Sequence, residues 1–477
     1  MPVQNADTTL YDSVASRIAT LIEKGTLRAG QRIPSVRKLS RQYQVSVSTV
    51  LQAYQKLESR SLIQARPQSG YYVRARMQSK PAEPEMSSPA KAPRSVSVSE
   101  LVMRVVQAAR DPEIVPLGAA VCSAEMVPIQ QLNRILGQVA RRFPKLSHSY
   151  EFPPGNEMLR VQIARRMMEA GCTLSPAEIV ITCGTQEAVN LCLRAVTKPG
   201  DTVLIESPTF YGLLQTIESL HLRALEVPTH PRTGICMDAL ARTLRKTRVN
   251  ACLLTTNFSN PLGSSMPDEN KKALVKMLAQ RQIPLIEDDI YGELVFGSAR
   301  PKAAKSWDRD GWVLYCSSFS KTLAPGYRVG WTSPGRFRED VERLKFVNTL
   351  ANVSLTQMAV AEFLANGGYE RHLRRIRKTY HDCVEHFTRM IVKHFPQGTR
   401  LTCPGGGFLL WVELPAGSDA LELHHRAQEH KISIAPGPIF SASGKYTNFI
   451  RLNCGLPCTE ALDDVIATLG RLASELN

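Results

Sequence analysis

The sequence lacks the features that would place the chain in or across a membrane. It has no uninterrupted apolar run of about 18 residues, so we expect no membrane-spanning helix. Roughly the first 30 residues contain no apolar stretch bounded by basic residues and a cleavage site, so we expect no signal peptide. Both absences favour a cytoplasmic protein.

The sequence also lacks paired cysteines. Its 11 cysteines include no CxxC pair, and Cys454 and Cys458 are too isolated to indicate a zinc site, so we expect no metal. Without a secretory signal, an odd number of scattered cysteines favours free thiols in a reducing compartment.

The composition describes a globular protein with a basic end. At 477 residues the chain is long enough for more than one domain, and its apolar and charged fractions of 43% and 21% are ordinary. The formal net charge is +16, and residues 1–75 hold 11 Lys and Arg against 4 Asp and Glu. A basic surplus at one end is typical of a polyanion partner, although basic surfaces are often merely solvated.

The N-terminal segment has the pattern of three short helices. Apolar residues recur at helical spacing over the first, which the glycines of GTLRAG end; they are Leu10, Val14, Ile18, Leu21 and Ile22. Ser35 and Ser46 stand where N-caps of a second and third helix belong. Two short helices joined by a tight turn form a helix-turn-helix, whose second helix enters the DNA major groove.

The residues that follow predict a wing beside these helices. LIQARPQSGYYVR reads as a two-stranded hairpin that turns at Gly70. A small helical bundle without a ligand is the alternative. The hairpin together with the local basic surplus favours a DNA-binding domain over residues 8–75.

This segment resembles the winged helix-turn-helix of the GntR regulators. The family pattern is present as GTLRAGQRIPSVRKL and VSVSTVLQAYQKL. The resemblance implies a double-stranded DNA operator and places five residues at DNA-contacting positions: Arg37, Ser46, Ser48, Thr49 and Gly70. Many members have arginine where this chain has Val47, which removes one possible phosphate or guanine contact.

Residues 76–98 predict a flexible linker. RMQSKPAEPEMSSPAKAPRSVSV is rich in Pro, Ser, Ala and Lys and has no hydrophobic periodicity. A helical pattern, SELVMRVVQAARDP, opens the unit that we expect over residues 99–475.

The large segment predicts an α/β fold with a mainly parallel sheet. Short buried-looking runs alternate with helical patterns; they are EIVIT, DTVLIES, NACLLTTN, IPLIEDD and GWVLYCSS. Ligands of such sheets bind beyond the carboxyl ends of the strands, so the polar residues at those ends are the candidate site.

These strand ends carry residues that suit pyridoxal 5′-phosphate. Lys321 supplies an amine for a Schiff base, and Asp288 can keep a pyridine nitrogen protonated. A dianionic phosphate needs several donors, here Gly184, Thr185, Ser318, Ser320 and Arg328. Asn260 and Tyr291 can meet the ring hydroxyl, and Phe210 can stack on the ring. Each motif alone is common, but their order on consecutive strand ends favours this cofactor.

Residues 99–475 resemble the fold-type I aminotransferases of the aspartate aminotransferase class. Their lysine motif is present as SFSKTLAPGYRVG, and their asparagine motif NPTG as NPLG. The resemblance implies that Tyr150 reaches the phosphate of a neighbouring subunit and that Arg451 binds a substrate or effector carboxylate. It also implies that Asp288 and Lys321 are the catalytic pair.

The whole chain resembles the MocR subfamily of GntR regulators, which join a winged helix to an aminotransferase-like domain. The resemblance implies a bacterial transcriptional regulator that senses pyridoxal phosphate or an amino compound and is nucleoid-associated when DNA-bound. It also implies a head-to-tail homodimer. The alternative is an active transaminase with an accessory DNA-binding domain.

Overall fold

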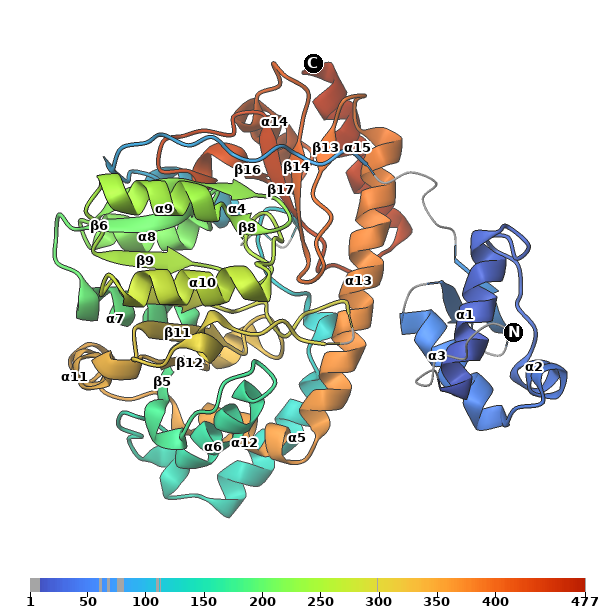
Figure 1. The fold of residues 1–477 in the computed structure, drawn as a ribbon, viewed down its shortest axis with the longest axis horizontal. Coiled ribbons are helices and arrows are strands. Elements are labelled where there is room, and N and C mark those ends of the chain that lie inside the picture. The colour runs from blue at the N-terminus through green and yellow to red at the C-terminus, as the bar shows by residue number, and fades with distance from the viewer. Residues whose placement is uncertain are drawn as a thin grey trace. The chain divides into compact units, whose positions relative to one another are not determined.

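The computed structural model describes residues 9–59, 62–66, 69–74, 81–108, 111, 113–297 and 299–476. The chain divides into two compact units, Met1–Lys80 and Pro81–Asn477 (Figure 1). Residues 8, 60–61, 67–68 and 75 of the expected DNA-binding domain and residues 76–80 of the expected linker lie outside the described residues. No helix in the described ranges is long and apolar enough to cross a membrane.

The smaller unit has the three expected helices and the hairpin. They are α1 (Leu10–Glu23), α2 (Val36–Tyr43), α3 (Val47–Ser59) and the antiparallel pair β1 (Ile63–Arg66) and β2 (Gly70–Val73). Ser35 accepts the Lys38 backbone N–H, and Ser46 accepts that of Thr49 at 3.0 Å, so both predicted N-caps are present. Leu10, although part of the apolar periodicity, is 69% exposed at the first turn of α1.

Burial of one face of α3 holds this unit together. Val50, Tyr54 and Leu57 are fully buried and pack with α1, α2 and the hairpin, whereas Val47 and Leu51 on the opposite face are 47% and 39% exposed. The turn between α2 and α3 is made by Gln44, whose φ is 52°. The outward face of α3 is therefore presented for a partner.

The segment expected to be a linker belongs, over residues 81–98, to the larger unit. Its short strand β3 (Arg94–Ser95) pairs antiparallel with β7 (Arg223–His230) and forms an edge of the sheet. The Thr229 backbone N–H donates to the Ser87 hydroxyl at 2.8 Å. Pairing with a sheet edge satisfies backbone groups whatever the side-chain pattern, so the sequence carried no periodic signal for it.

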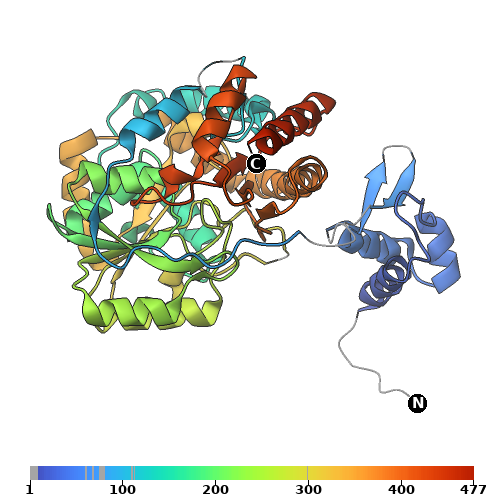
Figure 2. The same cartoon turned by 90° about the horizontal axis from the view of Figure 1, so that it is seen from above.

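The larger unit is built on a mostly parallel sheet of nine strands, with the order β3-β7-β6-β9-β10-β11-β12-β5 and β8 paired to β7. Helices cover both faces (Figures 1 and 2). The strands not yet bounded are β5 (Val180–Thr182), β6 (Thr202–Ser207), β8 (Gly234–Ile235), β9 (Ala251–Leu254), β10 (Leu285–Asp288), β11 (Val313–Ser318) and β12 (Gly330–Ser333). Covering helices are α4 (Ser99–Ala108), α7 (Thr185–Val196), α8 (Tyr211–Ser219), α9 (Met237–Lys246), α10 (Asp268–Ala279) and α11 (Arg338–Thr349).

A second, antiparallel sheet of the order β13-β14-β17-β16 follows towards the C-terminus, and the sequence patterns did not predict it. Its strands are β13 (Arg400–Leu401), β14 (Leu409–Glu413), β16 (Ala435–Pro436) and β17 (Phe449–Asn453). The helices α14 (Ala420–Glu429) and α15 (Glu460–Glu475) pack on it, and β4 (Val115–Pro116) pairs with β15 (Ile432–Ser433). The helix α13 (Gly368–His394) runs from α12 (Ser354–Ala365) to α15 (Figure 1).

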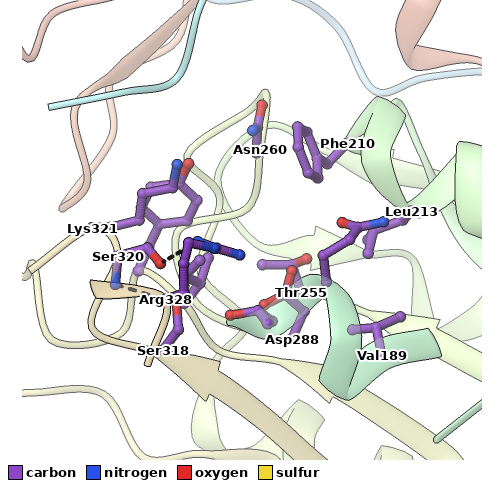
Figure 3. A pocket seen from close by; sticks show the side chains of 14 residues that line it. Val189, Phe210, Leu213, Thr255, Asn260, Asp288, Ser318, Ser320, Lys321 and Arg328 are labelled. Atoms are coloured by element: carbon purple, nitrogen blue, oxygen red, sulfur yellow. Dashed lines mark hydrogen bonds between the residues drawn. The ribbon is translucent and has the colours of Figure 1, made fainter. Parts of the chain in front are cut away.

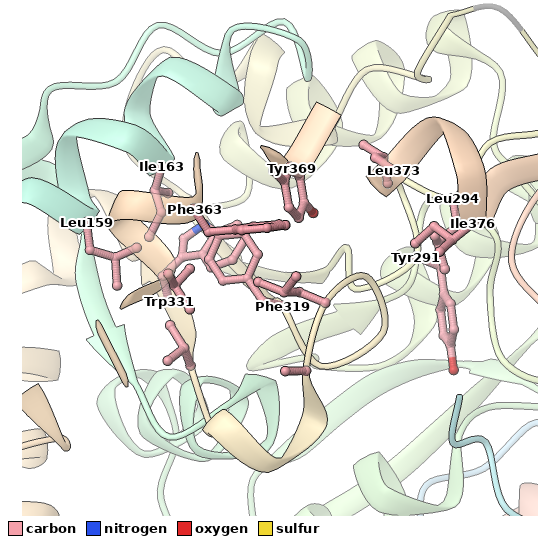
Figure 4. Packing of buried hydrophobic residues seen from close by; sticks show 14 of the residues in the cluster. Leu159, Ile163, Tyr291, Leu294, Phe319, Trp331, Phe363, Tyr369, Leu373 and Ile376 are labelled. Atoms are coloured by element: carbon pink, nitrogen blue, oxygen red, sulfur yellow. The ribbon is translucent and has the colours of Figure 1, made fainter. Parts of the chain in front are cut away.

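An aromatic cluster anchors the loop that follows β11. Phe319 is fully buried and lies 4.9 Å from the Trp331 ring and 5.8 Å from the Tyr369 ring, centroid to centroid (Figure 4). The helices α5 (Ile129–Arg142) and α6 (Glu157–Met167) belong to the same core. Because Phe319 is held in the core, its neighbours in SFSK are fixed at the edge of the sheet.

Candidate active site and DNA-binding surface

The carboxyl ends of five strands converge on one cavity. β6, β9, β10 and β11 are parallel, and β5 runs the same way because it and β11 both pair antiparallel with β12. The cavity at this edge has a volume of about 180 Å³ (Figure 3). Nine of the predicted cofactor residues line it: Thr185, Phe210, Asn260, Asp288, Tyr291, Ser318, Ser320, Lys321 and Arg328.

Lys321 enters the cavity from the loop that Phe319 anchors. Its ammonium group donates a hydrogen bond to the Ala120 backbone oxygen. Burial, with smaller contributions from the nearby cations of Arg451 and Arg328, lowers the pKa of Lys321 to about 8, against the opposite effect of Cys122 and Asp288. A lysine with a lowered pKa has more free amine near neutral pH and is a better nucleophile.

Asp288 faces the cavity because side chains alternate along β10. Its neighbour Asp289 points the other way, where it pairs with Arg300 at 2.7 Å and accepts from the Tyr315 hydroxyl at 3.0 Å. Asp288 is buried, and its Oδ1 has no hydrogen-bond partner among the described residues. Burial, with a smaller effect from Asp289, raises the pKa of Asp288 to about 7.

An anion site forms between α7 and the loop before β12. Gly184 is the N-cap of α7 with φ +83°, so the first turn of the helix presents free backbone N–H groups. Arg328 lies against it, donating from Nη2 to the Cys183 backbone oxygen at 2.8 Å and from Nη1 to the Ser320 hydroxyl at 3.4 Å. The buried Thr185 hydroxyl has no partner among the described residues.

Arg451 lies behind the cavity and does not line it. It is fully buried on β17, donates from Nη1 to Asn260 Oδ1 at 3.2 Å, and also donates to the Gly118 backbone oxygen. Its Nε is buried without a partner among the described residues. A buried guanidinium with a free N–H can receive a carboxylate.

Two more of the predicted residues lie off the cavity wall. Gly184 is not on the lining, but a Cβ added there would fall 2.5 Å from Nη2 of Arg328. Tyr150 is outside the cavity and 71% exposed, and it stacks on Phe152 at 5.8 Å between ring centroids.

Four of the predicted DNA-contacting residues lie on α2 and at the start of α3, and the fifth, Gly70, lies on the hairpin. Arg37 is exposed on α2 and Ser48 at the start of α3, and the Ser46 hydroxyl lies 2.7 Å from that of Ser48 and 2.8 Å from that of Thr49. Gly70 begins β2 with φ +100°. The Arg32 side chain lies over it, 3.3 Å from the position of an added Cβ. Arg32 is exposed and basic, and the sequence reasoning missed it.

Comparison with known proteins separates the same two units. Residues 132–469 match the model of aminotransferase class I and II, and residues 10–73 match that of the bacterial regulatory proteins of the gntR family. The chain belongs to the class I and II aminotransferase family. Its N-terminal unit is a GntR helix-turn-helix, and the combination agrees with the MocR subfamily.

Similar proteins are found for the whole chain and for the larger unit. The uncharacterized HTH-type transcriptional regulators YdcR and YjiR of Escherichia coli are 41% and 40% identical to it, over 98% and 97% of this chain and 99% and 98% of theirs. The 2-aminoadipate transaminase of Thermus thermophilus is 30% identical over 78% of this chain and 92% of its own. The crystal structure of LysN from that organism, an α-aminoadipate aminotransferase, superposes with a TM-score of 0.72, 28% identity, and coverage of 80% and 99%.

Membership of this aminotransferase family implies pyridoxal 5′-phosphate, and the cavity fits it. Asp288 offers an unpartnered buried oxygen, and Thr185 an unpartnered buried hydroxyl. Arg328, Ser320 and the N-terminus of α7 supply donors of the kind that a phosphate requires. Lys321 supplies the amine.

Sequence reasoning missed several residues of the aminotransferase cavity. Gln186 and Thr255 line it, and Glu206 is buried behind it, where its Oε2 accepts the Thr255 backbone N–H at 2.8 Å. Burial raises the pKa of Glu206 to about 8. Glu206 and Thr255 stand in the runs DTVLIES and NACLLTTN, and Gln186 follows the selected Thr185. Their positions were therefore visible in the sequence, but their residue types did not indicate the cofactor.

Replacing Gly184 should weaken cofactor binding. In Gly184→Ala the new Cβ displaces the Arg328 guanidinium, and we expect at least about a tenfold loss of pyridoxal phosphate affinity, since charge-assisted hydrogen bonds contribute about 1.5–3 kcal/mol each. Titration of the apoprotein, followed by absorbance, measures it. Gly200→Ala is the matched control, because Gly200 has φ +88° but nothing within 4 Å of an added Cβ. Equal losses in the two variants would contradict the assignment.

The rate of covalent cofactor attachment should follow the pKa of Lys321. Only the free amine attacks an aldehyde, so a pKa lowered to about 8 makes the rate rise about tenfold per pH unit below that value and level off above it. Rapid mixing of apoprotein and cofactor across this range measures the rate. Lys321→Ala should show no covalent phase, and a wild-type midpoint near the ordinary lysine value would refute the assignment.

Proposed function

We propose that the chain is a transcriptional regulator in which bound pyridoxal phosphate, or its adduct with an amino compound, controls DNA binding. One observation carries the proposal: a single chain holds both an exposed helix-turn-helix surface and a cavity with every residue type that the cofactor requires. Two relatives that match over almost the whole chain are named as HTH-type transcriptional regulators. In this view residues 8–75 bind the operator and residues 99–475 bind the ligand.

On the DNA side, α3 enters the major groove of the operator. Ser46, Ser48 and Thr49 present hydroxyls at its N-terminus for phosphates or base edges. Arg37 on α2 meets the backbone, and Gly70 lets the wing approach closely. When bound to its operator the protein belongs to the bacterial nucleoid.

On the ligand side, each predicted cofactor residue takes one part of pyridoxal phosphate. Ser318, Ser320, Arg328, Gly184 and Thr185 hold the phosphate. Asp288 hydrogen-bonds the pyridine nitrogen, Asn260 and Tyr291 meet the ring hydroxyl, and Phe210 covers the ring. The cofactor supplies an aldehyde that condenses with amines and a ring that withdraws electrons. Lys321 would hold the cofactor through its amine, and an amino compound would compete with that amine for the aldehyde.

The effector is an amino compound with a carboxylate that Arg451 binds. Arg451 lies behind Asn260, and its unpartnered Nε is available to an anion. Binding of a carboxylate to Arg451 costs little extra desolvation of the guanidinium, because this side chain is already fully buried. A ligand held by both Lys321 and Arg451 can change DNA affinity only if it binds two protein states differently.

A second copy of the chain completes the assembly. Tyr150, Phe152 and Phe346 form a continuous aromatic series, with ring centroids 5.8 Å and 6.0 Å apart, and Val347 and Val353 are also exposed. All five are more than half exposed in the single chain. Exposed apolar side chains that lie together are typical of an interface. We propose a head-to-tail homodimer in which Tyr150 reaches the partner's phosphate site.

Transamination is a second candidate function. Lys321 and Arg451 are both present, and a relative 30% identical over most of its length is a 2-aminoadipate transaminase. Those residues suit exchange of an amino group between acids. If transamination were the main function, the presence of a helix-turn-helix unit on the same chain would have no explanation.

Loading with pyridoxal phosphate should change DNA affinity by at least about fivefold, the lower end of ordinary coupling. Fluorescence anisotropy of a DNA fragment from upstream of the chain's own gene, with apoprotein and loaded protein, measures the ratio. Lys321→Ala should remove the difference and leave apoprotein binding within about twofold. Lys198→Ala, on an exposed loop, is the control and should retain the difference.

Salt and turnover measurements complete this test. The logarithm of affinity should fall with that of salt by about 0.9 per neutralised phosphate, and Arg37→Ala should reduce the slope by about 1. Rapid multiple turnover of an amino acid with a keto acid, without specific DNA binding, would favour the transaminase.

Tyr150→Ala should lower the affinity for pyridoxal phosphate, because Tyr150 is proposed to contact the phosphate bound in the partner subunit. If Tyr150 contributes to the partner's site, the variant loses phosphate affinity even where it remains dimeric, as measured by light scattering and cofactor titration on the same sample. Tyr72→Ala, on the wing of the smaller unit, is a control for loss of a partly exposed tyrosine. Unchanged cofactor affinity in a dimeric Tyr150→Ala protein would contradict the role.

A further inference from the structure

Two cysteines far apart in sequence meet where α13 approaches the segment between β17 and α15. The Sγ atoms of Cys383 and Cys458 lie 3.4 Å apart. Cys383 is buried on α13, whereas Cys458 is exposed just before Thr459, the N-cap of α15. The Cys383 thiol also lies 3.4 Å from the Leu456 backbone oxygen, so both the helix and the segment constrain the pair.

The surroundings of Cys458 favour its thiolate. Interaction with the neighbouring Cys383 thiol is the largest effect and lowers the pKa of Cys458, with help from the Arg389 cation. Partial burial and the carboxylates of Asp463 and Asp382 oppose it. The N-terminus of α15, one residue away, also favours a negative charge. An exposed thiol with a lowered pKa is the kind that reacts with oxidants.

A second pair of neighbouring cysteines shows that a short distance between two sulfur atoms is not enough for reaction with an oxidant. Cys192 and Cys316 lie 3.6 Å apart between α7 and β11, and both are fully buried. Burial raises the pKa of Cys316 far above its ordinary value. The Cys316 thiolate is therefore disfavoured, and burial of both thiols leaves that pair without a path for an oxidant.

We propose that Cys383 and Cys458 form a reversible disulfide when the protein meets hydrogen peroxide. The Cys458 thiolate attacks one peroxide oxygen, the O–O bond breaks, and hydroxide leaves, so Cys458 becomes a sulfenic acid. The Cys383 sulfur then attacks the Cys458 sulfur, the S–O bond breaks, and the Cys383 proton leaves with the hydroxyl group as water. In total two thiols lose two electrons and two protons, and the peroxide becomes two molecules of water.

The new bond would fasten α13 to the end of the strand that carries Arg451. Cys458 follows β17 by a short segment, and that segment holds the chain beside Lys321: the Gly455 backbone oxygen accepts the Ser123 N–H at 3.1 Å. Asn453 donates to the Val121 backbone oxygen at 2.9 Å. The disulfide therefore joins two elements that border the ligand-binding part of the larger unit.

Peptide mapping of the full-length, cofactor-loaded protein tests the proposal. After brief treatment with hydrogen peroxide and alkylation of the remaining thiols, we expect a peptide that links Cys383 to Cys458 and returns to two free thiols with dithiothreitol. The Cys458 thiol should disappear at least about tenfold faster than that of Cys192, because Cys458 is exposed and Cys192 is fully buried. Amide hydrogen exchange over residues 454–462 should slow in the oxidised protein.

Three variants separate the possible outcomes. Cys458→Ser, an exposed position, should abolish the linked peptide, and Cys383→Ser should leave a Cys458 sulfenic acid that dimedone traps. Cys192→Ser, which alters the buried pair, should leave the linked peptide unchanged. The proposal is overturned if Cys383 in the wild-type protein stays a free thiol while Cys458 oxidises, or if the linked peptide joins Cys458 residues of two chains.

Discussion

The burial of Lys321 and Asp288 in one small cavity is the constraint on which the rest of this site depends. Loss of water disfavours both charges: it lowers the pKa of the amine to about 8 and raises that of the carboxyl group to about 7. Both groups therefore have pKa values close to neutral pH. Such values suit an amine that must attack an aldehyde and a carboxyl group that must hydrogen-bond a ring nitrogen. The converging strand ends and the buried Phe319 ring hold these two groups in the cavity.

Much of this arrangement follows from local sequence. The five apolar runs became β5, β6, β9, β10 and β11, since a strand buried on both faces needs an unbroken apolar sequence. The selection of Asp288 agrees with strand alternation, since Asp289 points the other way and pairs with Arg300. The helix-turn-helix was equally predictable from the sequence, because the N-cap side chains of Ser35 and Ser46 accept hydrogen bonds from backbone N–H groups only three residues further along the chain.

Other features depend on contacts that local patterns do not encode. The pairing of β3 with β7 uses backbone groups alone, so the Pro-rich segment that contains β3 looked like a linker. The C-terminal sheet is made of strands as short as two residues, below the length at which alternation is visible. Arg451 could be selected only by resemblance, because its hydrogen bond to Asn260 joins residues 191 positions apart.

In the proposed regulator, ligand binding by the larger unit and DNA binding by the smaller unit are linked through free energy. If the ligand state of the larger unit changes DNA affinity, then operator DNA must change ligand affinity by the same factor. The most direct test is a titration of the full-length apoprotein with pyridoxal phosphate, with and without saturating operator DNA. We predict two dissociation constants whose ratio equals that of the DNA affinities with and without the cofactor. Identical cofactor affinities in the two titrations would contradict the central claim.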